Sequence, residues 1–149
     1  MANTNPAAVL DANLLVAGAC RHEESPAYQI LMAILHRRLH LILTEGIIAE
    51  YEDVLLRPAV RRLTGLTPNQ SRELILDLVA LSQQTQLQFG WRPNLADEAD
   101  NKFIEAAIAG AAVIVTYNTR HFQQIDLVKH GWEIMTPFEF ITLYDLEAT

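Results

Sequence analysis

The sequence predicts an α/β protein with a mostly parallel central sheet, and three observations support this prediction. Short apolar runs alternate with longer segments whose apolar residues recur at helical spacing. The apolar runs are continuous, which is typical of strands that are buried on both faces of a parallel sheet. Threonine or serine followed by proline, or by a residue that completes a capping box, precedes several helical segments. A chain of 149 residues fits a single domain over 1–149.

The first half of the chain is expected to alternate two strands with helices. The predicted strands are residues 7–11, which end on Asp11, and residues 39–43. The predicted helices begin after Ser25, which precedes a proline, after Thr44, after Leu56-Arg57 and after Thr67. We expect the third to be short, the second to cover 45–57, and the last to continue to about Gln84.

The second half is expected to add strands and two more helices. Residues 86–89, 112–116 and 133–136 are the predicted strands, and the first of these is the weakest pattern. A helix over 100–109 precedes the strand at 112–116. Thr136-Pro-Phe-Glu139 is a second capping box, which predicts a C-terminal helix to about Leu146.

Asp100 falls on the apolar face of the helix predicted over 100–109. At about 100° per residue, Phe103, Ile104 and Ala107 share one arc, and Asp100 projects into its middle. An aspartate in this place needs a hydrogen-bond partner, a counter-charge or a metal ion. The alternative is that it is a helix N-cap, for which Asp97 is the better candidate.

Other polar residues stand where parallel strands end. Asp11 and Asn13 follow the first strand, and Thr116 and Asn118 follow the strand at 112–116. Glu50 lies at the edge of the apolar stripe of its helix. Ligands of open α/β sheets bind beyond the carboxyl ends of the strands. Carboxylates with amide or hydroxyl oxygens suit Mg²⁺ or Mn²⁺, which can activate water against a phosphodiester. The alternatives are a turn acid for Asp11 and a solvated surface acid for Glu50.

Several classes are excluded. The sequence has no P-loop, no dinucleotide fingerprint and no nucleophile elbow. Cys20 is the only cysteine, so an internal disulfide and a multi-thiolate zinc site are excluded. No apolar run is long enough to cross a membrane, and no secretory signal is visible, so we expect a cytoplasmic protein. The formal charge of −7 argues against a simple electrostatic nucleic-acid binder but not against an enzyme with clustered carboxylates.

Four segments together resemble a known family. They are Val9-Leu-Asp-Ala-Asn-Leu-Leu-Val16, the segment from Ile48 to Pro58, the segment from Asp97 to Ala107, and Ile114-Val-Thr-Tyr-Asn-Thr-Arg-His-Phe122. In order and spacing they resemble a PIN-domain protein, from the branch of toxin components of bacterial toxin–antitoxin pairs. The resemblance runs from about Val9 to about Ile141.

The resemblance implies a three-layer α/β/α sandwich and a Mg²⁺-dependent endoribonuclease, with Mn²⁺ as a substitute. It implies an RNA substrate, a cognate antitoxin, a homodimer and no membrane. The residues that match the family's acidic positions and metal ligands are Asp11, Glu50 and Asp100, and the fourth position is Asn118. Residues that would support the site are Asn13, Asp97 and Thr116.

Two positions depart from the family pattern and keep other functions open. Ala12 lacks the hydroxyl that often follows the first aspartate, and Asn118 supplies no charge, which should weaken metal binding. A PIN fold that serves as a protein-interaction module is the main alternative, and a hydrolase of small phosphate esters is a third. Arg21, Lys102 and Arg120 could contact RNA phosphates, or could be solvated surface charges.

Overall fold

The computed structural model describes residues 5–84, 101–119 and 133–146. Its centre is a sheet of parallel strands in the order β3-β2-β1-β4-β5. The strands are β1 (Ala7–Leu10), β2 (His40–Leu43), β3 (Gln83–Gln84), β4 (Val113–Val115) and β5 (Glu133–Met135). In the register, Ala8 pairs with Leu41 on one side and with Val113 on the other. The predicted α/β class with a parallel sheet is confirmed.

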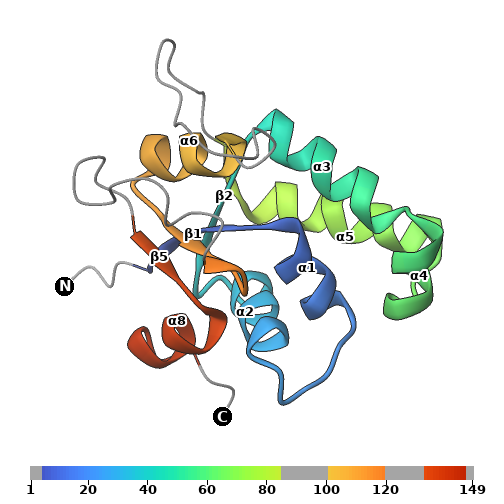
Figure 1. Cartoon of the computed structure of the whole chain (residues 1–149), viewed down its shortest axis with the longest axis horizontal. Coiled ribbons are helices and arrows are strands. Elements are labelled where there is room, and N and C mark those ends of the chain that lie inside the picture. The colour runs from blue at the N-terminus through green and yellow to red at the C-terminus, as the bar shows by residue number, and fades with distance from the viewer. Residues whose placement is uncertain (1–4, 85–100, 120–132, 147–149) are drawn as a thin grey trace.

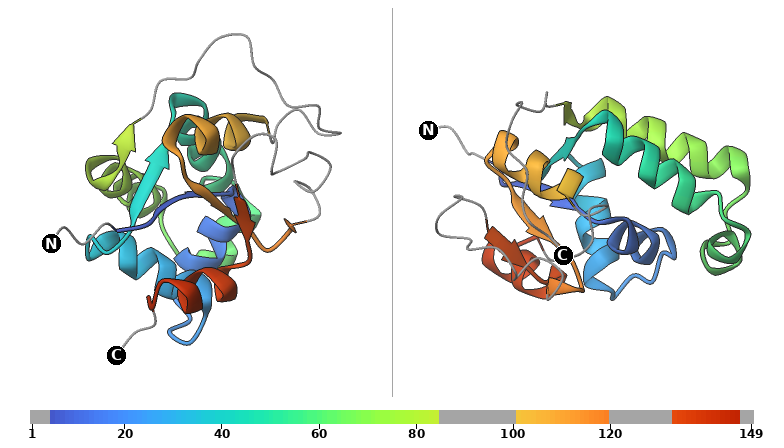
Figure 2. Two further views of the ribbon diagram at one scale, coloured as in Figure 1. Left: turned by 90° about the vertical axis from the view of Figure 1, so that its left-hand side faces the viewer. Right: turned by 45° about the horizontal axis from the view of Figure 1, so that its top comes forward.

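Helices cover both faces of this sheet. Those before β3 are α1 (Ala12–Ala19), α2 (Pro26–Leu35), α3 (Glu45–Leu55), α4 (Pro58–Thr64) and α5 (Pro68–Leu81). The later ones are α6 (Asn101–Gly110) and α8 (Pro137–Leu143). Figures 1 and 2 show α6 on one face of the sheet and α2 with α8 on the other. This arrangement is a three-layer α/β/α sandwich, as expected. None of the described helices is long and apolar enough to span a membrane.

The core lies where the central strands meet α6. Val9 and Ile114 are completely buried, and the side chains predicted for the apolar face of α6, Phe103, Ile104 and Ala107, are at most 1% exposed. Burying a side chain as large as Phe103 or Ile104 contributes about 1.5–3 kcal/mol. The helix is therefore fixed against the sheet, where it packs on β1, β2 and β4.

The helix-start signals are borne out in most cases. The side chains of Thr44, Thr67 and Thr136 accept hydrogen bonds from backbone N–H groups in the first turns of α3, α5 and α8. Both predicted capping boxes are formed, with Gln70 and Glu139 as the reciprocal partners. Ser25 stands in the expected place before α2, but its side chain makes no capping hydrogen bond.

The structure differs from the predictions at several boundaries. The chain passes from β1 directly into α1 (Figure 1), a helix that the sequence pattern did not predict. Residues 12–19 are almost entirely apolar, so they show no amphipathic period. Helix α3 ends at Leu55 because Arg57 is extended before Pro58. Helix α5 ends at Leu81 because Gln83 and Gln84 pair with β2. The strand predicted over 86–89 lies outside the described residues.

Candidate active site at the carboxyl ends of two strands

The candidate site lies at the carboxyl ends of β1 and β4, from which the chain continues toward opposite edges of the sheet. Strand β1 stands between β2 and β4, so the connections that follow β1 and β4 diverge from neighbouring strand ends. Such a switch point leaves a crevice at the carboxyl ends of the strands, where α/β proteins bind their ligands. Asp11 directly follows β1, and Thr116 directly follows β4. The sheet order therefore brings these two residues together.

Both carboxylate oxygens of Asp11 accept hydrogen bonds. Asp11 is the N-cap of α1, and its Oδ1 accepts from the backbone N–H of Leu14 at 2.9 Å. Its Oδ2 accepts from the hydroxyl of Thr116. A negative charge at this end of α1 is also favoured by the helix dipole. The carboxylate is thus fixed in orientation rather than free to rotate.

Thr116 connects Asp11 to the turn that carries Asn118. Its side chain is completely buried, and its Oγ1 accepts the backbone N–H of Asn118 at 3.0 Å while its hydroxyl donates to Asp11. Asn118 itself is exposed, as is Asn13 in the first turn of α1. The buried hydroxyl of Thr116 therefore orients both the Asp11 carboxylate and the backbone of Asn118.

Tyr51, which the sequence analysis did not assign to the site, lies near both Asp11 and Glu50. Its side chain is 1% exposed, and its hydroxyl donates to the carbonyl oxygen of Leu10, the residue before Asp11. Burial raises the pKa of Tyr51 well above its usual value of 10.0, and the negative charges of Asp11 and Glu50 raise it further. Two carboxylates from different elements thus act on one hydroxyl. The signal that could have revealed this role is that a buried tyrosine hydroxyl needs a partner.

Glu50 is partly buried and forms an ion pair with Lys102, so it is not a solvated surface acid. Its Oε1 lies 2.8 Å from the Nζ atom of Lys102, and 23% of the Glu50 side chain and 29% of the Lys102 side chain are exposed. The interpretation of Lys102 as a solvated charge is therefore wrong. Arg21, the second basic candidate, donates to the Thr64 carbonyl oxygen at 3.4 Å, which ties it to the end of α4. Arg120 lies outside the described residues.

The remaining predicted site residues, Asp97 and Asp100, also lie outside the described residues. Within the described ranges, no group of three or more His, Cys, Asp and Glu side chains could hold a metal ion. The described oxygen donors at these strand ends are nevertheless the hard ligands that Mg²⁺ and Mn²⁺ prefer. In chemical type they fit a divalent cation.

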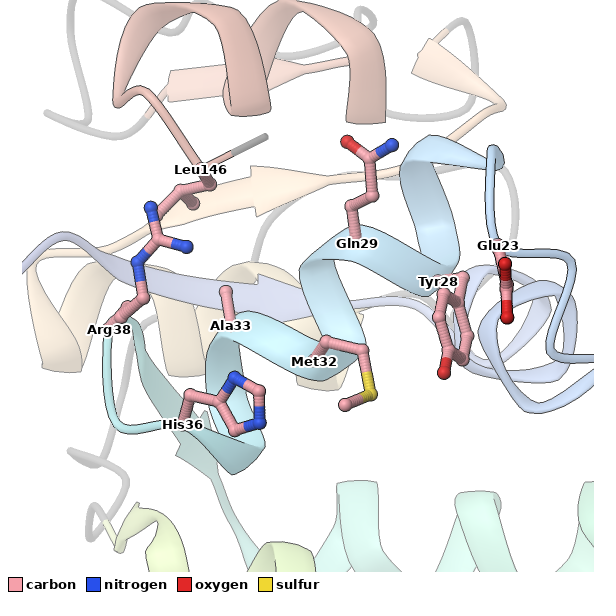
Figure 3. Close-up of a pocket in the computed structure, with 8 residues that line it drawn as sticks. All are labelled: Glu23, Tyr28, Gln29, Met32, Ala33, His36, Arg38 and Leu146. Carbon is pink, nitrogen blue, oxygen red and sulfur yellow. The ribbon is translucent and has the colours of Figure 1, made fainter. Parts of the chain in front are cut away.

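A hollow lies along α2 and shares no residue with this site. It is a cavity of about 340 Å³, and Figure 3 shows Arg38 and Leu146 at one end and Tyr28 and Glu23 at the other. No candidate catalytic residue lines it. We therefore place the candidate chemistry at the carboxyl ends of β1 and β4 and not in this cavity.

Comparison with known proteins identifies the fold family. A family model described as "PIN domain" matches residues 7–120, which include β1, Glu50, α6 and the turn after β4. No curated protein matches the sequence.

Proposed function

The chain belongs to the PIN-domain family, whose members are generally nucleases, and from this premise we propose that it is a Mg²⁺-dependent endoribonuclease. The observation that carries the proposal is that two carboxylates, Asp11 after β1 and Glu50 on α3, both lie close enough to the buried Tyr51 hydroxyl to act on it. Asp11 is held there by Thr116 and by the first turn of α1, and Glu50 acts on the same buried tyrosine as Asp11. A phosphodiester hydrolase needs such a cluster of oriented oxygens, whereas a purely structural core does not.

The proposed ligands of the divalent cation are Asp11, Glu50 and Asp100. A Mg²⁺ or Mn²⁺ ion bound by them would supply Lewis-acid activation of water and compensation for the negative charge that develops on the phosphate. Asp100 enters through the resemblance of the segment before α6 and through its predicted place on the apolar face of that helix. Asn118 is the fourth proposed catalytic residue, and we assign supporting roles to Asn13, Asp97 and Thr116.

The protein's own groups would orient the reaction. The hydroxyl of Thr116 and the backbone N–H of Leu14 hold Asp11 in one rotamer, so no rearrangement of this carboxylate is needed at the moment of reaction. Glu50 has one oxygen on Lys102, and its other oxygen would either bind the cation or accept the proton of the attacking water. The buried Tyr51 hydroxyl, whose pKa is raised, stays protonated and keeps donating to the Leu10 carbonyl.

The biological role that we propose is that of the toxin of a toxin–antitoxin pair. It is supported by the order and spacing of the four segments that resemble that branch. We further propose one catalytic domain over 1–149 and a homodimer with single-stranded RNA as substrate. Expression in a bacterial host with and without a candidate antitoxin would test the role, since a toxin should arrest growth only without its partner.

The enzymatic proposal is tested by RNA cleavage with matched variants. Asp11→Asn keeps an N-cap acceptor for α1 but removes the charge, because asparagine caps helices as well as aspartate does. We expect Asp11→Asn, Glu50→Gln and Asp100→Asn each to reduce Mg²⁺- or Mn²⁺-dependent cleavage about 10²–10⁴-fold. Glu52→Gln removes an exposed carboxylate from the same helix and should be fully active.

Two results would overturn the proposal. Full metal-dependent activity of Asp11→Asn would show that this carboxylate is not part of the reaction. Absence of both RNA cleavage and Mn²⁺ binding at millimolar concentration in the wild type would favour the interaction module instead. Ala12, Asn118 and the net charge of −7 are the features that this alternative would explain.

A further inference from the structure

The ammonium group of Lys102 lies against Glu50, and its side chain passes beside the first turn of α3. Its Nζ atom lies 2.8 Å from Oε1 of Glu50. A Cβ atom added to Gly46 would lie 4.0 Å from Cδ of Lys102, so the lysine side chain passes close to the first turn of α3. Gly46 and Glu50 are four residues apart and therefore share one face of that helix. Lys102 thus lies along this face from Gly46 to Glu50.

The Lys102–Glu50 pair differs from the exposed ion pair that Asp53 of α3 makes with Arg57. In the Arg57–Asp53 pair, the side chains are 58% and 67% exposed, whereas in the Lys102–Glu50 pair they are 29% and 23% exposed. Water screens the first pair strongly and the second much less. Glu50 is one of the two carboxylates, with Asp11, that raise the pKa of Tyr51, so the Lys102 charge also lies close to this group.

We propose that Lys102 is a built-in counter-charge of the carboxylate site, which positions Glu50 and competes with a divalent cation for that carboxylate. This inference rests on the metal site of the proposed function. A cation that binds Glu50 must share the carboxylate with the ammonium group or displace it, and the two positive charges repel each other. Lys102 therefore lowers the affinity for the metal while it stabilises the site when no metal is bound.

The test is calorimetric titration of Mn²⁺ into the full-length wild type and Lys102→Met, combined with thermal unfolding in EDTA. Methionine keeps an unbranched side chain along α3 but lacks the charge. We expect Lys102→Met to bind Mn²⁺ roughly 5- to 30-fold more tightly. This range assumes that the repulsion between one unit charge and the cation is reduced by an effective dielectric constant between that of water and that of a protein surface. In EDTA its Tm should fall by about 2–5 °C, because Glu50 loses its partner. Mn²⁺ should then raise this Tm more than it raises that of the wild type.

Two control variants separate this role from a general effect of charge. Arg57→Met removes one positive charge from the exposed pair between Asp53 of α3 and the residue before α4, and it should leave both the Mn²⁺ affinity and the Tm in EDTA almost unchanged. Lys102→Arg keeps the charge, so it should bind Mn²⁺ like the wild type.

The outcomes distinguish this inference from the proposed function. Mn²⁺ binding by Lys102→Met that is equal to or weaker than that of the wild type would overturn the counter-charge role, even if RNA is cleaved. Tighter binding in Lys102→Met would support it, even if no RNA substrate is found. If neither protein binds Mn²⁺, both the inference and the metal site are wrong.

Discussion

Thr116→Val is the substitution that most directly tests how the site is built. Valine has nearly the same shape as threonine, so a completely buried side chain is exchanged without a cavity. The change removes the hydroxyl that donates to Asp11 and that accepts the backbone N–H of Asn118. The Asn118 side of the turn is exposed, so water can replace that acceptor, whereas the half-buried Asp11 carboxylate loses a donor.

The expected loss of stability follows from these contacts. A hydrogen bond to a charged group contributes about 1.5–3 kcal/mol, and we expect the free energy of unfolding of Thr116→Val to fall by about 2–3 kcal/mol. For a chain of this size, this corresponds to a fall in Tm of about 5–10 °C. Urea unfolding at pH 7 measures the free energy, and calorimetric Mn²⁺ titration should show weaker binding because Asp11 is no longer held.

Thr64→Val is the matched control for this change. Thr64 is 3% exposed, and its hydroxyl donates to the Arg61 carbonyl oxygen at 3.5 Å and accepts the backbone N–H of Leu66 at 3.2 Å. Its partners are uncharged, so Thr64→Val should cost only about 1 kcal/mol. It should leave Mn²⁺ binding unchanged. The reasoning is refuted if Thr116→Val is no less stable than Thr64→Val, or if it binds Mn²⁺ like the wild type.

Two further predictions follow from groups whose pKa values are shifted. Because the pKa of Tyr51 is raised in the folded protein, its stabilising effect is complete below the usual tyrosine pKa of 10.0 and is lost as the pH rises above it. An absorbance titration of the folded protein should therefore show Tyr51 un-ionised until the chain unfolds, and Tyr51→Phe should abolish this late phase. The pKa of Glu139 is lowered mainly by its hydrogen bond with the Thr136 backbone N–H, so its effect is present above the usual glutamate pKa and is lost as the pH falls through the lowered value. Glu139→Gln should reduce the dependence of Tm on pH below about pH 5, and a Tm profile identical to that of the wild type would contradict the capping argument.

Much of the fold could be predicted because its signals are local. Thr44, Thr67 and Thr136 predict the helices that follow them, and continuous apolar runs predict β1, β2 and β4. Capping and strand burial depend on residues within one turn or one strand, so a single sequence contains them. Helix α1 was missed for a related reason, since a helix that is apolar on nearly every side has no period to detect.

Candidate site residues could also be located, but their contacts could not. The sequence identified Asp11 and Thr116 at the ends of strands, yet they are 105 positions apart, and only the order of the sheet makes them neighbours. Lys102 and Glu50 are 52 positions apart, and the direction of the lysine side chain depends on α6 lying across Gly46. The hydrogen bond from the Tyr51 hydroxyl to the Leu10 carbonyl joins residues 41 positions apart, so only the fold brings them together.

The sequence by itself therefore proposed the candidate groups, and it correctly placed Glu50 on a helix and Thr116 at the end of a strand. The tertiary structure decided which of these charges meet and which remain in water. The physical reason is that a carboxylate or an ammonium group changes its behaviour with burial and with charges a few ångströms away, and those distances are set by the packing of helices against the sheet.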